Sequence, residues 1–328
     1  MSAAEAPEMN TERDKAPEGY TPGSAMNEIK YSEAANEISD LARFIRDRTD
    51  EVLLYPNRGN AGDALIAAGT YRFFERNKIP FRFIRDGERF PADTVLWYCG
   101  GGNFVGYYND CACWLEKYAR ANPCVVLPHT INDTESLKKL PENTTLICRE
   151  RESYRICKEH ASCGIFLYPD MAFCLDPEDL GIVPEQGRGD LPAFRNDPEK
   201  TFTPPKGSID LSRLYIYDHY NKESVYRCAR LFLNAINDFE TIHTNRLHVA
   251  VGGWLLKKKV RLYPNSYYKN RAVFEYSLED SSVEFVEATD VLPTESDCRL
   301  IRYKLHGRFQ RIFCKLRKLV RRFDEKKQ

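Results

Sequence analysis

The chain has 328 residues, and its 48 Lys and Arg residues equal its 48 Asp and Glu residues in number, so the formal net charge is zero. A general nucleic-acid binder usually carries a basic excess, and we therefore expect no nucleic-acid partner. A hydrophobic fraction of 42% is enough for sizeable cores, and the length suits two domains of ordinary size.

The 11 cysteines do not follow a metal-binding pattern. Cys111 and Cys113 are spaced too closely for a zinc knuckle, and no second CxxC pair accompanies them. Scattered cysteines in apolar surroundings are typical of reduced, buried thiols in the cytoplasm. No apolar run approaches the ~20 residues that a membrane-spanning helix needs. We therefore expect a cytoplasmic protein without a metal site.

The chain begins with a polar segment and continues with a helical pattern. Residues 1–25 are rich in acidic residues and proline and contain no apolar core of a signal peptide, which predicts a disordered leader. Apolar residues then recur at helical spacing over 27–48, which predicts a helix at the start of the folded part.

Strands and helices alternate over the following residues, and the strands are apolar throughout. The predicted elements are strand 51–56, helix 64–77, strand 80–86, strand 93–99 followed by a glycine triplet, helix 113–122, strand 124–131, strand and helix within 144–153, and strand 164–173. Apolar strands in such alternation indicate an α/β domain with a buried, mainly parallel sheet. Functional loops are then expected at the carboxyl ends of the strands.

A second α/β unit follows a boundary. Residues 178–210 are rich in Pro, Gly and charge and predict a linker or crossover. Beyond it we predict strand 213–218, helix 223–238, strand 239–244, helix 245–258 and strand 259–264. The predicted organisation is therefore an N-terminal Rossmann-like domain over 26–177, a C-terminal Rossmann-like domain over 211–285, and a tail over 286–328.

The tail contains a basic amphipathic pattern over 299–323. Its apolar positions are Leu305, Phe309, Ile312, Leu316, Leu319 and Phe323, and basic residues fill the other faces. This pattern fits a closing helix packed on the domain or a coiled-coil seam. It fits equally well a helix that binds anionic lipid, which would place the protein peripherally at the inner face of the plasma membrane.

The segment "TNRLHVAVGG" places Arg246 and His248 where a predicted strand ends and a helix begins. A helix N-terminus has unpaired backbone N–H groups and a partial positive charge, which favour an anion. A guanidinium binds carboxylate or phosphate, and an imidazole can transfer a proton at neutral pH. The segment therefore predicts a site for a carboxylate or phosphate, with acid–base assistance.

Other candidate residues lie at the ends of the predicted strands. Glycine lets the backbone approach a ligand closely, so Gly62, Gly101 and Gly102 are candidate backbone contacts. The segments that contain these glycines lack the GxGxxG and P-loop patterns, so we do not expect a dinucleotide site. Asp63, Asn103, His129 and Arg149 also follow strands, where capping, core packing and surface ion pairing are the structural alternatives.

Five ordered motifs together resemble those of the polysaccharide pyruvyl transferases. They are "GNAGDALI" (59–66), "GGGNF" (100–104), "LPHTI" (127–131), "PDMAF" (169–173) and "NRLHVAVGG" (245–253). Weaker matches are "CRERES" (148–153), "LPAFRNDPEK" (191–200) and "YPNSYYKN" (263–270). The resemblance covers most of the chain, from about residue 52 to residue 278.

The resemblance implies a GT-B-like fold with the active site between two Rossmann-like halves. It also implies transfer of the enolpyruvyl unit of phosphoenolpyruvate to a sugar, either a nucleotide sugar or a lipid-linked glycan, to give a pyruvate ketal in the biosynthesis of exopolysaccharide or another cell-surface glycan. Neither a metal nor another cofactor is implied. By resemblance to the family, the site for the phosphoenolpyruvate donor consists of Arg246, Arg149 and His248, and Asp63 matches the aspartate of the "GD" motif.

These residues suggest roles for a ketal-forming reaction, which needs an acid for carbon and a base for hydroxyl groups. We expect His248 to be the general acid, and Asp63 or His129 to assist the hydroxyls. The expected acceptor and backbone cradle comprises Asn60, Gly62, Gly101, Gly102, Asn103 and Tyr107.

The sequence departs from the family pattern at several positions. Asn245 stands where the family commonly has Asp, His129 replaces a frequent Gln or Ala, and "FVGYYND" follows the glycine triplet. These departures leave two alternatives open: a GT-B-like glycosyltransferase that uses a nucleotide sugar, and a non-catalytic relative that binds glycan. The acceptor sugar, the ketal stereochemistry and the oligomeric state do not follow from the sequence.

Overall fold

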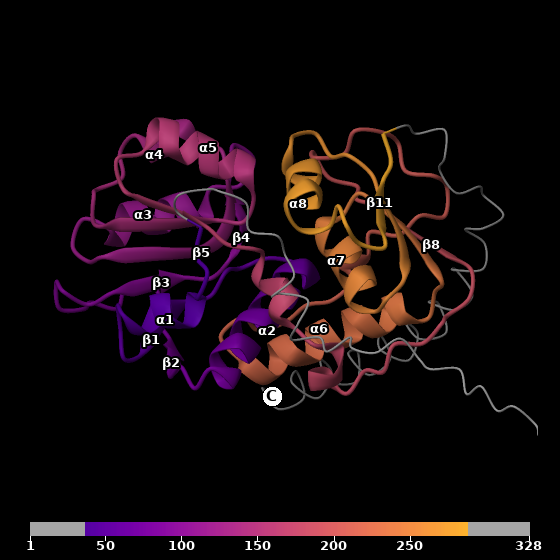
Figure 1. Ribbon diagram of the computed structural model, residues 1–328, viewed down its shortest axis with the longest axis horizontal. Coiled ribbons are helices and arrows are strands. Elements are labelled where there is room, and N and C mark those ends of the chain that lie inside the picture. Colours follow the sequence, from indigo (N-terminus) through magenta and orange to yellow (C-terminus); the bar gives the residue numbers. More distant parts are fainter. Residues whose placement is uncertain (1–36, 288–328) are drawn as a thin grey trace, which may run out of the picture.

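The computed structural model describes residues 37–287 and contains two parallel β-sheets with helices around them (Figure 1). The first sheet has seven strands in the order β2-β1-β3-β5-β6-β7, with β4 paired to β5. Its strands are β1 (Val52–Tyr55), β2 (Phe81–Phe83), β3 (Leu96–Tyr98), β4 (Gly101–Phe104), β5 (Cys124–Ile131), β6 (Thr144–Cys148) and β7 (Gly164–Leu167). Most of these strands are buried along their length, which is why their sequences are apolar rather than alternating.

The second sheet has four parallel strands in the order β11-β10-β9-β8. They are β8 (Asp190–Ala193), β9 (Thr241–Thr244), β10 (Lys259–Leu262) and β11 (Val283–Phe285). The helices are α1 (Leu41–Arg46), α2 (Ala61–Arg76), α3 (Asp110–Tyr118), α4 (Thr134–Leu137), α5 (Arg151–His160), α6 (Lys222–Asn237), α7 (Leu247–Leu255) and α8 (Lys269–Ser277), with short 3-10 turns η1 (Met171–Cys174), η2 (Pro177–Leu180) and η3 (Leu211–Arg213).

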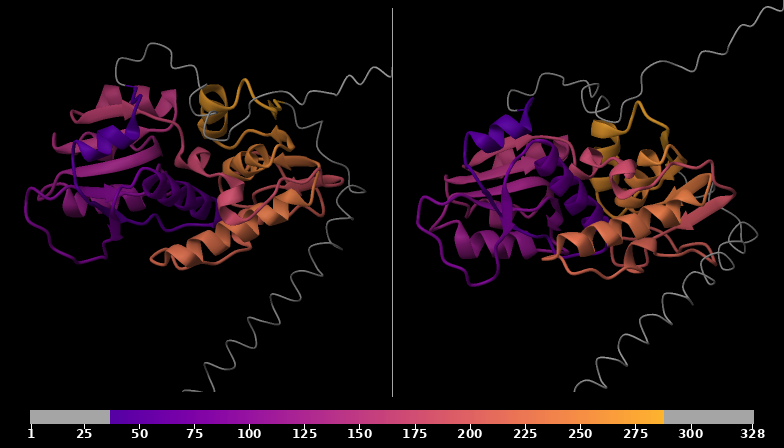
Figure 2. Two further views of the ribbon diagram at one scale, coloured as in Figure 1. Left: turned by 60° about the horizontal axis from the view of Figure 1, so that its bottom comes forward. Right: turned by 90° about the horizontal axis from the view of Figure 1, so that it is seen from below.

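Helix α6 belongs to the second half of the sequence but packs against α2 of the first half (Figure 2). One hydrophobic cluster runs through both halves and includes Val52 of β1, Leu65 of α2, Phe232 of α6 and Ile242 of β9. The two sheets therefore share a core. This shared core holds the carboxyl ends of both sets of strands at fixed positions.

Local sequence signals explain where α2 begins. Asn60 is its N-cap and accepts a hydrogen bond from the Gly62 N–H at 2.8 Å. Asp63 accepts one from the Asn60 N–H at 2.8 Å, which completes a capping box. The motif "GNAGD" therefore fixes the start of the helix and, at the same time, the position of the Asp63 carboxylate.

Most of the predicted elements form, and the differences have physical reasons. The sequence analysis predicted a glycine triplet after strand 93–99, and in the structure Gly101–Phe104 forms a further strand, β4, which continues along β5 beyond the end of β3. The strand predicted over 213–218 is wrong. This segment follows η3 and pairs with no strand of either sheet. Tyr215 and Tyr217 pack against the hydrophobic core while Ile216 is 97% exposed, so side-chain packing rather than strand pairing holds the segment.

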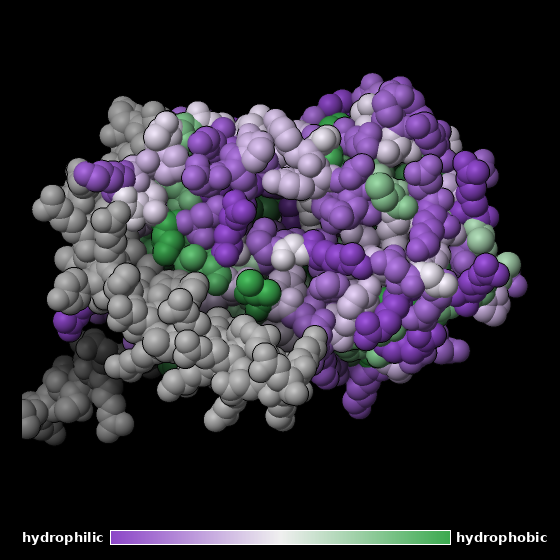
Figure 3. Space-filling view, turned by 180° about the vertical axis from the view of Figure 1, so that it is seen from behind, coloured by the Kyte–Doolittle hydropathy of each residue, from purple (hydrophilic) through white to green (hydrophobic). Residues whose placement is uncertain are grey.

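Other differences concern boundaries. Strand β8 lies inside the segment predicted as a crossover, and neither α8 nor β11 was predicted. Of the helix predicted over 27–48, residues 27–36 lie outside the described residues, and the described part is helical over Leu41–Arg46. The predicted leader over 1–25 and the basic amphipathic helix over 299–323 lie outside the described residues. Within residues 37–287, no helix combines the length and apolar character needed to cross a membrane, and the face shown in Figure 3 is mostly hydrophilic.

Gly69 on α2 is a position where packing requires glycine. A Cβ atom there would lie 2.0 Å from the Met171 carbonyl oxygen, because η1 crosses α2 in direct backbone contact. Gly69→Ala is expected to lower the free energy of unfolding by about 3 kcal/mol through overpacking. Gly106→Ala, where a Cβ meets open space, is the control and should change it by less than about 0.5 kcal/mol. Urea unfolding measures both, and equal stabilities would contradict the packing described here.

Candidate functional site

A cavity of about 530 Å³ opens where the carboxyl ends of the two sheets face each other. Its lining comes from the segments that follow β1, β3, β6, β8, β9 and β10. The lining residues are Arg58, Gly59, Asn60, Asp63, Gly102, Asn103, Tyr108, Asp110, Arg149, Arg195, Asp197, Pro198, Glu199, Ser212, Arg213, Arg246, Leu247, His248 and Lys269. Such a position is where ligands bind in open α/β sheets.

Asp170 links two of the predicted site residues. Its side chain is fully buried and lies 2.7 Å from Arg149 Nη1 and 3.3 Å from His248 Nε2. Burial alone would raise the pKa of Asp170, but His248 and Arg149 outweigh burial and hold that pKa well below its usual range. Asp170 is therefore an anion that orients both the guanidinium and the imidazole.

Glycines make room for these two side chains. A Cβ on Gly102 would lie 2.8 Å from Arg149 Nη2, and a Cβ on Gly62 would lie 3.0 Å from His248 Nδ1. Arg149 Nε donates to Thr130 Oγ1 at 2.8 Å, so the guanidinium is held on two sides. The glycine motifs thus permit the close approach of Arg149 and His248, which is a different role from binding a ligand through backbone N–H groups.

Asp63 lines the cavity at the start of α2. Burial raises its pKa, while the nearby His248 acts in the opposite direction. Besides the Asn60 N–H, it accepts a hydrogen bond from Asn57 Nδ2 at 3.2 Å. A carboxylate with a raised pKa that faces a cavity is suited to accept a proton from a hydroxyl group.

His129 is fully buried and is not part of the cavity lining. The Asn103 backbone N–H donates to its Nε2 at 3.0 Å. Burial, and secondarily Arg149, holds the pKa of His129 well below its usual range, so the imidazole is neutral. His129 therefore holds Asn103 in place, and the geometry gives it no contact with a substrate in the cavity.

The other wall of the cavity consists of ion pairs around Arg246. Arg246 donates to Asp210 through Nε at 2.9 Å and Nη2 at 2.6 Å, and its Nη2 also lies 2.8 Å from Asp197. Arg195 binds Asp197 at 2.7 Å and Glu199 at 2.5 Å. Arg246 was predicted to clamp the anion. It lines the cavity, but two carboxylates already engage it.

The structure brings Arg149, Arg246, His248, Asp63, Asn60, Gly102 and Asn103 to one cavity. It leaves Gly62, Gly101, Tyr107 and His129 outside the lining, and Tyr108 is the tyrosine that reaches the cavity. Sequence reasoning missed the roles of Asp170, Arg195, Glu199 and Lys269. The signals were present in the motifs "PDMAF", "LPAFRNDPEK" and "YPNSYYKN", each of which contributes one of these residues or more.

Asn245 occupies a position between β9 and α7 and is fully buried. Its Oδ1 accepts a hydrogen bond from the Arg195 backbone N–H at 2.8 Å. The amide therefore fixes the loop after β8 without adding a charge beside Arg246.

Among residues 37–287, no group of three or more His, Cys, Asp or Glu side chains is arranged to hold a metal ion.

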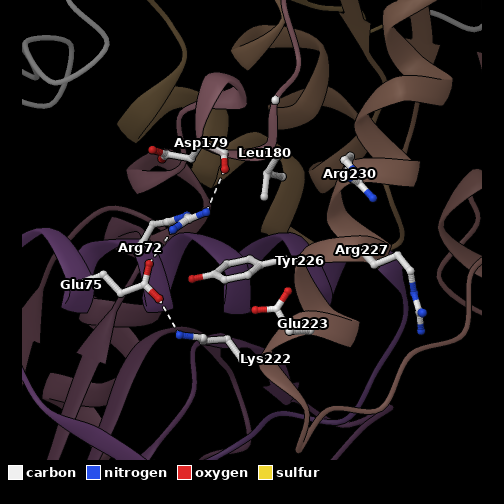
Figure 4. A pocket seen from close by; sticks show the side chains of 10 residues that line it. Arg72, Glu75, Asp179, Leu180, Lys222, Glu223, Tyr226, Arg227 and Arg230 are labelled. Carbon is white, nitrogen blue, oxygen red and sulfur yellow. Dashed lines mark hydrogen bonds and ion pairs between the residues drawn. The ribbon is translucent and has the colours of Figure 1, made fainter.

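A second depression of about 440 Å³ lies between α2, η2 and α6 (Figure 4). Several of its charged groups are paired with each other. Arg72 binds Glu75 at 2.7 Å and Lys222 binds the same carboxylate at 2.9 Å. The lining of this depression contains none of the candidate site residues named from the sequence. The cavity between the sheets is therefore the better candidate site.

Comparisons with known proteins show what the chain is similar to. The sequence model of the family described as polysaccharide pyruvyl transferase matches residues 60–267. The chain is 26% identical over 278 residues to a Bacillus subtilis (strain 168) protein named "Putative pyruvyl transferase EpsO", covering 69% of this chain and 84% of that protein. It is 24% identical over 292 residues to "General stress protein 30" of the same organism, covering 75% and 82% respectively.

A solved structure is also similar. The crystal structure of the uncharacterized protein KP1_0663 from Klebsiella pneumoniae subsp. pneumoniae NTUH-K2044 aligns with a TM-score of 0.69 and 29% identity, covering 76% of this chain and 97% of that one. The matched family segment contains Asp63, Arg149, Asp170 and His248. The chain is a transferase, and it belongs to the polysaccharide pyruvyl transferase family.

Proposed function

We propose that this protein transfers the enolpyruvyl group of phosphoenolpyruvate to a pair of sugar hydroxyls, forming a pyruvate ketal and releasing phosphate. The observation that carries the proposal is the convergence of Arg149, His248 and Asp63 in one cavity, with the buried Asp170 paired to Arg149 and His248. This cavity offers a cation for the donor, an imidazole as acid and a carboxylate as base. The proposal places the protein in the assembly of a cell-surface glycan such as exopolysaccharide.

The donor would bind through its two anionic groups. The Arg149 guanidinium reaches the cavity beside Gly102, and α7 begins at Leu247 with its N-terminus at the same cavity. Backbone N–H groups of a helix N-terminus and a guanidinium are both suited to phosphate or carboxylate. Arg246 contributes positive charge at this helix start, although Asp210 and Asp197 offset part of it.

The first chemical step joins donor and acceptor. His248 would donate a proton to C3 of phosphoenolpyruvate, which turns the methylene into a methyl group and makes C2 cationic. An acceptor hydroxyl attacks C2, and Asp63 accepts its proton. Asp170 Oδ2 lies 3.3 Å from His248 Nε2 and would hold the imidazole in position for this transfer.

The second step closes the ketal. The C2–O bond to phosphate breaks and its electron pair leaves with the phosphate, which Arg149 would stabilise electrostatically. The second hydroxyl of the sugar attacks C2 and loses its proton to the departing phosphate. Tyr108 presents an aromatic ring at the cavity, which suits stacking against a sugar.

The test is release of inorganic phosphate from phosphoenolpyruvate, measured with a panel of nucleotide sugars and lipid-linked glycans. We expect release only with an acceptor, together with a product whose mass increases by one pyruvate ketal. Thermal shifts with phosphoenolpyruvate and with UDP-sugars provide a second readout, because a ligand that binds the native state raises the unfolding temperature.

Two outcomes would contradict the proposal. Stabilisation by UDP-sugars alone, together with glycosyl transfer, would identify a glycosyltransferase of similar fold. Binding of sugars without phosphate release from phosphoenolpyruvate for any acceptor would identify a non-catalytic relative.

A further inference from the structure

Lys269 is a buried cation at the candidate site that the proposed chemistry has not used. It is the first residue of α8, it lines the cavity, and its side chain is 11% exposed. Its Nζ donates to Glu199 Oε2 at 2.6 Å. Because α8 follows β10, Lys269 belongs to the second sheet, whereas Arg149 follows β6 of the first sheet.

Gly102 is the point where these two cations meet. A Cβ atom on Gly102 would lie 2.8 Å from Arg149 Nη2 and 4.0 Å from Lys269 Cδ. Both side chains therefore approach the same glycine, one from each sheet. The space that the missing Cβ leaves is bordered by a guanidinium on one side and a lysine side chain on the other.

The hydrogen bonds of Lys269 leave it able to bind a ligand. An ammonium group has three donors, and the hydrogen bond to Glu199 uses one of them. Glu199 Oε2 also accepts from Arg195 Nη1 at 2.5 Å and from Asn265 Nδ2 at 3.0 Å. Glu199 would therefore remain hydrogen-bonded if Lys269 turned toward an anion in the cavity.

We propose that Lys269 and Arg149 form a two-cation site over Gly102 that binds the anionic donor from both sheets at once. This inference rests on the proposed function, since the donor it names is phosphoenolpyruvate. An anion placed between the two cations reduces their mutual repulsion and bridges the two halves of the molecule. Lys269 is then a donor-binding residue of the second sheet, matching Arg149 of the first.

The site predicts a dependence of donor binding on pH. Burial lowers the pKa of Lys269 to about 8, Glu199 opposes this shift, and Arg195 and Arg149 add to it. The other charged or titratable groups near it are Asp63 of α2 and Tyr267, whose ring lies 5.0 Å from the ammonium. The lysine is charged below about pH 8, so donor affinity should fall as the pH rises through that value.

The experiment compares Lys269→Met and Lys269→Arg with the wild type. We expect Lys269→Met to raise the KM for phosphoenolpyruvate by about ten- to a hundredfold, the usual range for a lost charge-assisted hydrogen bond, with a smaller change in kcat. Lys269→Arg keeps its charge at high pH. Its KM should therefore lack the rise near pH 8 that the wild type shows, whatever its absolute value.

Matched controls separate binding from structure. Lys138→Met removes an exposed lysine that is also paired with one glutamate, Glu135 at 2.7 Å, and should leave KM unchanged. Gly102→Ala fills the space between the two cations and should weaken donor binding without removing a charge. Calorimetric titration with phosphoenolpyruvate measures binding by all variants, and thermal unfolding without ligand reports whether they are folded.

The outcomes distinguish this inference from the proposed function. If the wild type binds and turns over phosphoenolpyruvate but folded Lys269→Met does so with the same KM, the two-cation site is wrong and the proposed function stands. If Lys269→Met does not fold, Lys269→Arg decides: loss of the rise in KM near pH 8 supports the inference, and an unchanged rise overturns it. If the wild type neither binds nor consumes phosphoenolpyruvate, both proposals fail.

Discussion

Replacing Arg149 with methionine is expected to lower the free energy of unfolding by about 3–5 kcal/mol and to abolish phosphate release. The guanidinium is 1% exposed and is the cationic partner of Asp170, which is itself fully buried. Without Arg149, the Asp170 carboxylate would keep only the His248 imidazole as a side-chain partner among the interactions described above. A buried charge without a partner destabilises the folded state, because no ion pair offsets the free-energy cost of removing that charge from water.

The control is Arg155→Met on α5. Arg155 is paired with Glu152 at 2.7 Å and Glu159 at 3.1 Å, but its side chain is 60% exposed. Exposed ion pairs contribute about 0–1 kcal/mol, so the control should remain near wild-type stability. Urea unfolding of both variants tests the difference, and a similar small loss for both would show that Asp170 does not depend on Arg149.

A double variant separates stability from activity. Arg149→Met combined with Asp170→Asn removes both charges while the side-chain oxygen that caps η1 at Ala172 can remain. We expect it to recover part of the stability lost in Arg149→Met, because no uncompensated charge stays buried. It should remain inactive, since the cation proposed to stabilise the departing phosphate is still missing.

The sequence predicts the fold well where local signals and tertiary structure agree. The buried apolar strands β1, β3, β5, β6 and β7 and the capped helix α2 follow from apolar runs and capping residues. The sequence pattern fails to predict a strand correctly where the pairing of strands determines the structure. Tyr215 and Tyr217 pack against the core while Ile216 between them is exposed, as in an edge strand, but the segment joins neither sheet. The local sequence cannot show whether such a segment finds a strand to pair with.

The site shows the same limit. Two signals, position at strand ends and the resemblance to the family, predict that the site contains Asp63, Arg149, Arg246 and His248. All four line the cavity. Asp170 was not indicated because its importance lies in partners that are distant in sequence, 21 residues away for Arg149 and 78 for His248. His129 shows the reverse case, since a residue at a strand end can point into the core instead of the cavity.

His248→Ala is expected to lower kcat by about 10²–10⁴-fold, the usual contribution of a general acid, with a smaller effect on the KM for phosphoenolpyruvate. The imidazole lies against Gly62 and faces the cavity on a side chain that is 14% exposed. Asp170→Asn should lower kcat less, because the imidazole would remain while the carboxylate that orients it would be gone. Stability should change little in His248→Ala, since its partner Asp170 keeps Arg149.

The reaction in D₂O identifies the step that His248 assists. Protonation of C3 introduces one deuterium into the ketal methyl group, which mass spectrometry of the product detects. If His248 is the acid, His248→Ala slows this incorporation and phosphate release together, and His160→Ala on α5 leaves both unchanged. Wild-type rates of deuterium incorporation and phosphate release in His248→Ala would remove the imidazole from the mechanism. The acid would then have to be sought among the remaining groups at the cavity, where Asp63 has a carboxyl group whose pKa is raised by burial.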